Sequence, residues 1–287
     1  MNFLVLLTAV VIEFTLAWVV HLRAPHWSTR WAAWLATACA GLGLYRGAVG
    51  AALLLGLPLA GAALLFDWLW DHASLFYHLA SLALLVWLLG PTDLKREIEE
   101  YRRSLGAGRD EYTPAFAVTT AGLDLGPASG DPEFDACRGE FAAIALSAER
   151  AWFAPLFWFF VAGPVGVLAY RLAANLEHAA EVEDSIARVV GQVHEALACV
   201  PARITALSLG VAGTLVPVLE GLVAGGLFRW GASAQLVARA ALAATDHGRV
   251  HDDASDAPRR YRAAQMDALV RRALNVWMVL FAVAAVA

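Results

Sequence analysis

Long uncharged stretches, separated by clusters of charged residues, constrain this chain more than any other feature. Residues 47–66 and 151–170 each give 20 consecutive positions without Asp, Glu, Lys or Arg, and residues 204–228 give 25 positions interrupted only by Glu220. A helix needs about 20 apolar residues to cross the ~30 Å hydrocarbon core of a bilayer. The pattern therefore predicts a membrane protein with several helical segments.

Three further stretches complete the expected membrane set. Residues 1–20 are apolar apart from Glu13, residues 72–92 contain no Asp, Glu, Lys or Arg, and residues 273–287 are uncharged. The chain is 60% hydrophobic and 16% charged, whereas soluble domains are about 45–50% apolar and about 25% charged. Backbone groups in lipid must be bonded internally, and no alternating barrel pattern is present. We therefore expect an all-α polytopic membrane protein with four to six membrane segments and cytoplasmic helical insertions.

The basic residues indicate which connections face the cytoplasm. Residues 21–46, 91–150 and 229–272 together hold 18 of the 21 Lys and Arg residues, and cytoplasmic connections are enriched in these residues. This predicts a periplasmic N-terminus. If 151–170 and 204–228 both span the membrane, residues 171–203 lie outside and the protein has six spans. If both segments re-enter, residues 171–203 stay inside and four helices cross. The sequence leaves both topologies open.

The charge pattern divides the chain into four parts. These are N-terminal membrane helices (1–91), a cytoplasmic helical insertion (92–150), membrane-associated broken helices (151–228), and cytoplasmic helices followed by a C-terminal membrane helix (229–287). Outside the membrane, we expect a charged helix, an amphipathic helix that runs into 151–170, a short apolar helix and a basic helix. Their expected ranges are 93–105, 132–150, 234–244 and 259–272.

Several common chemistries are excluded. The chain has no phosphate-binding GxxxxGK[ST] loop, GxGxxG, GxSxG or HExxH motif. Its three cysteines are far apart and form no disulfide framework or zinc cluster, and a net charge of −5 gives no basic footprint for nucleic acid. His247 and His251 stand beside Asp252 and Asp253 in a polar stretch. This composition favours a hydrated loop over a metal site, so no metal site is predicted.

Glu13, Arg171 and Arg203 are candidates for one polar site. An acid inside a membrane segment is costly and marks function, and an Arg can bind a phosphate or carboxylate bidentately. Arg171 follows a break at residues 163–166, which exposes backbone groups, and Arg203 follows Pro201, which we expect to start a helix. The alternative is three unrelated charges at the membrane boundary, with the arginines extending to water.

Five short motifs, in this order, resemble the AmpE family of inner-membrane proteins associated with β-lactamase induction. That family is related to the CobD/CbiB cobinamide-phosphate synthases, which join an amino-alcohol phosphate to adenosylcobyric acid with ATP. The motifs are Glu13, Ala154-Pro155-Leu156-Phe157-Trp158, Gly163-Pro164-x-Gly166, Tyr170-Arg171 and Pro201-Ala202-Arg203. The resemblance implies a ligand-binding role for Glu13, Tyr170, Arg171 and Arg203.

The chain departs from the synthase pattern at several acids. The synthases carry Asn-Thr-x-Asp shortly after Tyr-Arg, where this chain reads Ala174-Asn175-Leu176-Glu177. They also carry paired acids before Pro-Ala-Arg, at the places of His194 and Glu195. AmpE-type chains usually carry Asp-Trp where this chain has Ala198 and Cys199. The loss of acids that would handle a metal or a proton argues against full synthase activity.

The resemblance implies a regulatory or signalling protein of the bacterial inner membrane, linked to β-lactamase induction and cell-wall recycling. Besides the lipid bilayer, its expected partner is a nucleotide, a muropeptide or a lipid-linked anionic ligand. The alternative is a cobalamin-pathway membrane enzyme, an ATP-dependent amide-forming ligase, with ATP implied by the resemblance alone. A second alternative is a transporter, which the broken 151–170 segment and Glu13 also fit, although no inverted repeat supports it.

Overall fold

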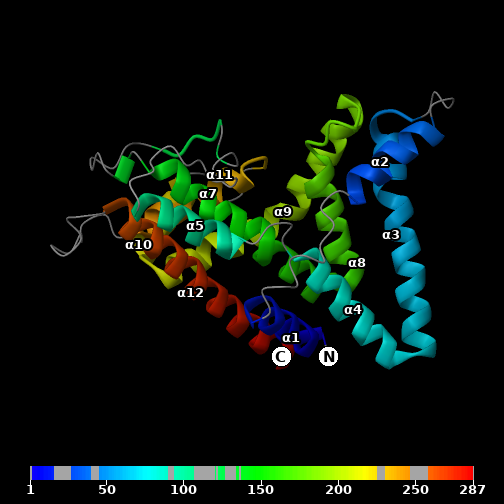
Figure 1. Ribbon diagram of the computed structural model, residues 1–287, viewed down its shortest axis with the longest axis horizontal. Coiled ribbons are helices and arrows are strands. Elements are labelled where there is room, and N and C mark those ends of the chain that lie inside the picture. The colour runs from blue at the N-terminus through cyan, green and yellow to red at the C-terminus, as the bar shows by residue number, and fades with distance from the viewer. Residues whose placement is uncertain are drawn as a thin grey trace. The chain divides into compact units, whose positions relative to one another are not determined.

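The computed structural model describes residues 2–15, 27–39, 45–89, 94–106, 120, 122–126, 134–135, 137–224, 230–245 and 258–286. Across these ranges the regular structure is helical, without strands, which confirms the all-α fold (Figure 1). The elements are α1 (Asn2–Thr15), α2 (Trp27–Ala38), α3 (Gly47–His72), α4 (Ser74–Leu88), α5 (Leu94–Gly106), α7 (Arg138–Ala148), the π-helical turn η3 (Glu149–Phe153), α8 (Ala154–Leu176), α9 (Asp184–Ala212), α10 (Leu215–Ala224), α11 (Ser233–Ala244) and α12 (Pro258–Val286).

Four helical segments are long and apolar enough to cross a membrane. They are Gly47–His72, Arg138–Leu176, Asp184–Ala212 and Ala263–Val286. Three shorter apolar helices accompany them, at Phe3–Glu13, Ser74–Leu88 and Leu215–Ala224. These segments identify the chain as a helical membrane protein.

No single helix covers 204–228, and whether this segment crosses the membrane or re-enters stays open. Helix α9 passes through Pro201 and ends at Ala212, and α10 begins only at Leu215. Thr214, between the two helices, makes hydrogen bonds to the end of α11. Its N–H donates to the Ala244 carbonyl (3.1 Å), and its hydroxyl donates to the Ala243 carbonyl (2.8 Å). These contacts with the end of α11 divert the backbone from the helix. Pro201 accordingly lies inside a helix rather than at the start of one.

The described residues form two compact units. The first contains Met1–Pro91 and Ala154–Ala198, and the second contains Thr92–Phe153 and Cys199–Ala287. In the first unit, α8 packs against α1, α2, α3 and α4. Helices α3 and α4 form a hairpin with Ala73 alone between them (Figure 1). The core of this first unit includes the fully buried Leu54, Leu85 and Tyr170.

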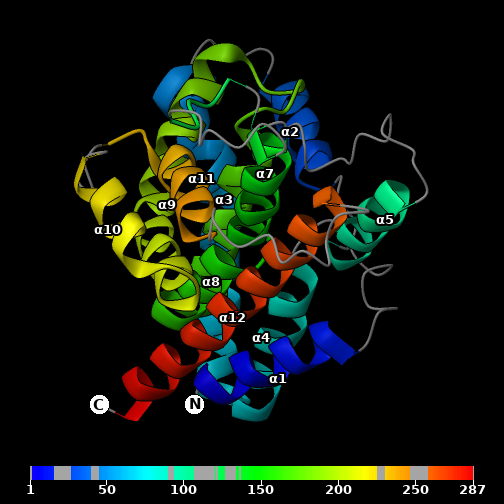
Figure 2. The same cartoon turned by 90° about the vertical axis from the view of Figure 1, so that its left-hand side faces the viewer.

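The second unit is built around α7. Helices α5, α11 and α12 pack against α7, and α10 packs against α11 (Figure 2). Phe141 and Ile144 of α7 are buried. The Trp277 ring of α12 stacks on Phe153, with the ring centroids 5.6 Å apart. This apolar interior holds α11 against α7.

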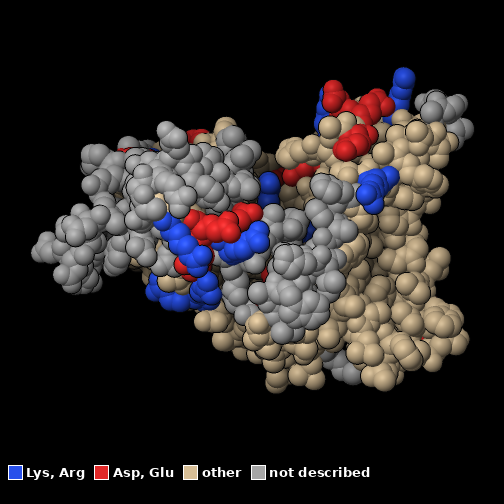
Figure 3. Space-filling model, in the orientation of Figure 1, with Lys and Arg blue, Asp and Glu red and all other residues tan. Residues whose placement is uncertain are grey.

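Charged side chains are unevenly spread over the first unit. Figure 3 shows a surface without charged groups along much of α3 and α4, and a cluster of acids and bases near the connection between α8 and α9. The uncharged surface includes large exposed side chains, among them Leu64 (72%), Leu75 (68%) and Phe76 (63%). Contiguous exposed apolar surface of this kind marks contact with a membrane or a partner. On a chain with membrane-length helices, it is suited to lipid.

Candidate functional site

Helix α8 is interrupted at Gly163. This residue has φ 63° and ψ −153°, a conformation that is essentially restricted to glycine. Pro164 follows, and a residue before proline is disfavoured in the helical region. The Tyr77 hydroxyl of α4 lies 3.7 Å from the position that a Cβ at residue 163 would occupy. A Cβ at Gly166 would lie 2.5 Å from the Trp158 carbonyl oxygen. The break expected at 163–166 is therefore present, and both glycines are required by the backbone.

Two prolines inside helices are matched by indole donors from neighbouring helices. Pro201 has no N–H for the carbonyl four residues earlier, that of Leu197. Trp158 of α8 donates its Nε1–H to the Leu197 oxygen at 2.8 Å. In the same way, Pro58 of α3 cannot bond the Leu54 carbonyl, and Trp31 of α2 donates its Nε1–H to that oxygen at 2.9 Å. Each of these hydrogen bonds joins two helices at the place where a proline removes one backbone hydrogen bond of a continuous helix.

The Tyr170-Arg171 pair is buried. Tyr170 is 0% exposed and packs in a cluster with Ala154 and Ala198. Arg171 is 4% exposed, and its Nε–H donates to the Leu88 carbonyl oxygen at 2.5 Å. Leu88 ends α4, and the last carbonyls of a helix have no donor within the helix. The Arg171 guanidinium thus caps α4 and places a positive charge at its negative end.

A His–Glu pair joins the end of α8 to α9. The His194 Nδ1 lies 2.7 Å from Glu177 Oε2, and the two side chains are 7% and 10% exposed. A carboxylate only accepts hydrogen bonds, so Nδ1 is the donor in this pair. The Nε2 atom is buried and makes no hydrogen bond within the described residues. The Tyr170 ring packs on the imidazole, with the centroids 5.4 Å apart.

Sequence reasoning identified Glu177 and His194 only as departures from the synthase pattern. The structure shows that the two departures contact each other. They are 17 positions apart in the sequence, and the reversal of the chain between α8 and α9 brings them together. The signal available in the sequence was the type of replacement, an acid at one place and an imidazole at the other.

The residues of the predicted polar site are distributed over both units. Glu13 is half-buried on α1, which packs against α8, the helix that carries Arg171. Arg203 belongs to the second unit, and its Nη1–H donates to the Cys199 carbonyl one turn earlier, at 2.5 Å. A joint site of Glu13, Arg171 and Arg203 remains a prediction.

Metal binding finds no support in the part of the chain that the structure describes. Within those ranges, no group of three or more His, Cys, Asp or Glu side chains could hold a metal ion. The candidate pair His247 and His251, with Asp252 and Asp253, lies outside the described residues. Glu177 has a second histidine nearby, His178 at 3.5 Å, but that side chain is 81% exposed.

The fold defines a class, the polytopic helical membrane proteins, and the site adds a buried His–Glu pair beside a glycine-broken helix. No protein-family model, curated protein or solved structure matches this chain. Its function is therefore argued from its own residues.

Proposed function

We propose that the chain is a regulatory protein of the bacterial inner membrane, of the kind that the resemblance to AmpE implies, acting in β-lactamase induction and cell-wall recycling. The observation that carries the proposal is the Glu177–His194 pair. The synthases that the sequence resembles have acids at the corresponding places. Two carboxylates facing each other suit a divalent cation and its nucleotide. In this chain His194 takes one of these places and bonds the Glu177 carboxylate, so that carboxylate faces a hydrogen-bond donor instead of a second acid.

The burial of the pair supports a conformational rather than a catalytic role. Both side chains are at least nine-tenths buried, and the Tyr170 ring packs against the imidazole at an interplanar angle of 53°. A catalytic acid or base must come within hydrogen-bonding reach of its substrate. A pair that joins two helices and is closed to solvent instead makes their packing depend on one polar contact. A protein that reports a ligand or a condition needs such a contact between elements that can rearrange.

In the proposed orientation the N-terminus is periplasmic, and residues 92–150 and 229–272 are cytoplasmic. The support is the distribution of the basic residues. Reporter fusions after residues 120 and 255 test it. Periplasmic signal from either fusion would overturn the orientation without bearing on the regulatory role.

Deletion of the gene in its own bacterium tests the function. The proposal expects an altered β-lactamase response to a β-lactam and unchanged growth when cobyric acid, the corrinoid on which the synthases act, is the only corrinoid supplied. Wild-type protein and the His178→Ala variant should restore the response, because His178 is exposed. Glu177→Ala should not restore it at a matched membrane level. A normal response together with a new cobalamin requirement would contradict the proposal and favour the ligase.

A further inference from the structure

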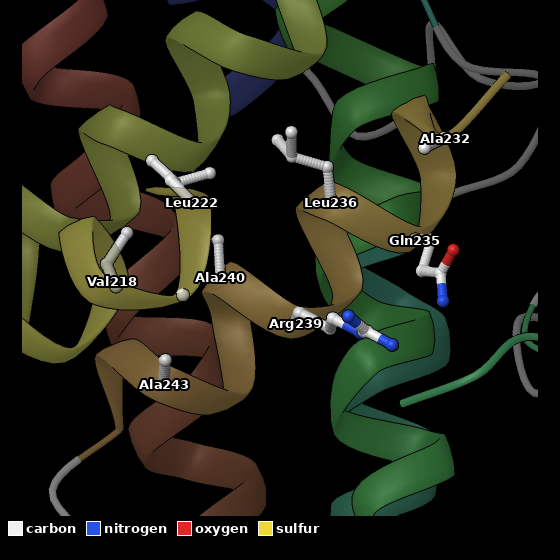
Figure 4. A pocket seen from close by; sticks show the side chains of 9 residues that line it. Val218, Leu222, Ala232, Gln235, Leu236, Arg239, Ala240 and Ala243 are labelled. Atoms are coloured by element: carbon white, nitrogen blue, oxygen red, sulfur yellow. The ribbon is translucent and has the colours of Figure 1, made fainter. Parts of the chain in front are cut away.

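The cavity between α10 and α11 in the second unit is narrow (Figure 4). Its volume is about 40 Å³, which is room for a few water molecules, whereas small-molecule sites measure ~300–1,000 Å³. Apolar side chains line the facing sides of the two helices, and Gln235 and Arg239 lie along one edge. The cavity is therefore a gap in the packing of α10 on α11. The surface at the turn of the α3–α4 hairpin is the more informative feature.

One exposed face of α3 changes from apolar to acidic as the helix approaches this turn. Leu64 is exposed, and Asp67 and Asp71 are exposed three and seven positions later, so the three side chains share one helix face. An aspartate at the centre of a membrane helix costs about 2.5–3.5 kcal/mol, whereas Leu64 belongs to the uncharged surface of the hairpin. A boundary between hydrocarbon and polar surroundings fits between Leu64 and Asp67, over about 4.5 Å of helix.

The turn also carries large apolar side chains at the level of these acids. Trp68 is 55% exposed and Trp70 is 56% exposed. The Trp70 ring packs edge-to-face against Tyr77 of α4, with the ring centroids 5.1 Å apart, so the first turn of α4 lies beside the last turn of α3. In that first turn of α4, Leu75 and Phe76 are exposed. Acidic and apolar side chains are thus exposed together at one level of the hairpin.

Neither bulk water nor hydrocarbon suits this mixture of side chains. Water would surround the four large apolar groups, and hydrocarbon would surround the two carboxylates at a high cost in free energy. The headgroup layer of a bilayer accepts both kinds, and Trp and Tyr are enriched there. This layer is about 5–7 Å thick on each side of the hydrocarbon core. The helix from Asp67 to His72 rises about 7.5 Å, so the end of the hairpin has the height of that layer.

We propose that the turn of the α3–α4 hairpin, residues 67–76, lies in the headgroup layer of the bilayer and anchors the first unit there. The carboxylates of Asp67 and Asp71 contact headgroups and water, and the indoles of Trp68 and Trp70 lie at the border with the acyl chains. The partner of this surface is lipid rather than a soluble protein. The depth of the turn then sets the level at which both helices of the hairpin enter the hydrocarbon.

Spin-label accessibility tests the depth of the turn in the full-length protein, reconstituted in vesicles of phosphatidylethanolamine and phosphatidylglycerol. Its native cysteines are replaced by alanine, and single labels are attached in Leu64→Cys, Ala73→Cys, Phe76→Cys and the control Glu181→Cys. Glu181 is exposed in the connection between α8 and α9. We expect the labels at 73 and 76 to be at least threefold less accessible to a water-soluble nickel chelate than the label at 181, and at least threefold more accessible than the label at 64. Accessibility equal to that at 181 would place the turn in water, accessibility equal to that at 64 would place it in hydrocarbon, and either would overturn the proposal.

Removal of the indoles tests what holds the turn at this depth. The Trp68→Ser/Trp70→Ser variant should raise the nickel accessibility of the label at 73 at least twofold, because serine has no preference for the border of the hydrocarbon. Trp34→Ser on α2 is the matched control, because Trp34 is also an exposed indole (59%), and it should leave that accessibility unchanged. Equal accessibility in the two variants would show that the indoles of the turn are not an anchor.

Tryptophan fluorescence answers the same question with the native cysteines in place, which matters because Cys137 is buried and its replacement can disturb the fold. The difference between wild type and Trp68→Phe/Trp70→Phe reports the two indoles of the turn. We expect lipids brominated near the headgroup to quench this difference at least twofold more than aqueous iodide or lipids brominated near the chain end. Strongest quenching by iodide would place the indoles in water, strongest quenching by chain-end bromine would place them in hydrocarbon, and either contradicts the proposal.

Discussion

The hydrogen bond from Trp158 to the Leu197 carbonyl gives the sharpest test of how this fold is held together. The bond is 2.8 Å long and partly buried. It serves a carbonyl whose helical donor is removed by Pro201. Trp158→Phe keeps an aromatic ring and removes the N–H. Leaving a buried acceptor unsatisfied costs about 1–3 kcal/mol in soluble proteins, and hydrogen bonds between membrane helices average about 0.6 kcal/mol, with a maximum near 1.7 kcal/mol. We expect the lost bond to lower the free energy of unfolding by about 1 kcal/mol.

A double-mutant cycle isolates that quantity. In Pro201→Ala the backbone N–H of residue 201 can bond Leu197 within the helix, so the indole becomes redundant. The packing change of Trp158→Phe is the same in both backgrounds and cancels in the cycle. We therefore expect Trp158→Phe to cost about 1 kcal/mol less in the Pro201→Ala background than in wild type. The measurement is reversible unfolding of the purified protein in mixed micelles, followed by circular dichroism.

The second proline supplies the control. Trp31 bonds the Leu54 carbonyl in α3, where Pro58 removes the donor. Trp31→Phe should couple to Pro58→Ala, as Trp158→Phe couples to Pro201→Ala. The crossed pair, Trp158→Phe with Pro58→Ala, should be additive within about 0.3–0.5 kcal/mol. An equal cost of Trp158→Phe with and without Pro201 would refute the reasoning, because the indole would then act through packing alone.

Three other predictions follow from single sites. Glu177→Ala leaves the buried His194 Nδ1 without its acceptor and should lower the free energy of unfolding by about 1–3 kcal/mol. His178→Ala changes an 81% exposed side chain and should leave thermal unfolding unchanged. Equal effects of the two substitutions would contradict the role of the Glu177–His194 pair. The Gly126 N–H, followed by Arg239, lowers the pKa of the Asp124 carboxyl in the folded protein. The ionised carboxylate therefore stabilises the fold above the ordinary aspartate pKa near 3.9, and this stabilisation is lost as the pH falls through the lower pKa of the folded state. A carboxyl-carbon NMR titration with a midpoint at or above the ordinary value would disprove this. Gly163→Ala should cost about 1–3 kcal/mol in chemical unfolding, and a neutral result would show that α8 can close into a regular helix.

The extent of the membrane helices could be predicted only as far as charge spacing defines it. The uncharged stretch 47–66 identifies α3, but the helix continues to His72, past Asp67 and Asp71. Charges do not end a helix at a membrane boundary, and α3 stops only where Ala73 leaves the helical conformation. The end of α9 was missed for a different reason. Thr214 bonds to residues at the end of α11, and no local pattern reports a partner 30 residues further along the chain.

In the candidate site, too, features set by local sequence could be predicted, and features that depend on distant residues could not. The break at Gly163 was predictable because glycine followed by proline has a local backbone consequence. The roles of Arg171 and of the Glu177–His194 pair were not, because their partners come from other helices. Ligand binding by Arg171 stays a prediction. Its hydrogen bond to the Leu88 carbonyl at the end of α4 could not be predicted, because Leu88 lies 83 positions earlier in the sequence.

The unequal lengths of α3 and α4 make bilayer thickness a variable of this fold. The uncharged part of α3, residues 47–66, is about 30 Å long and matches the ~30 Å hydrocarbon core. Helix α4 has 15 residues, so it is about 22 Å long and about 8 Å shorter than that core. A short hydrophobic helix is accommodated by thinning the bilayer beside it. Arg171 caps α4 at Leu88, so lipids with shorter chains should favour the native packing at this end of α4 and longer chains should oppose it.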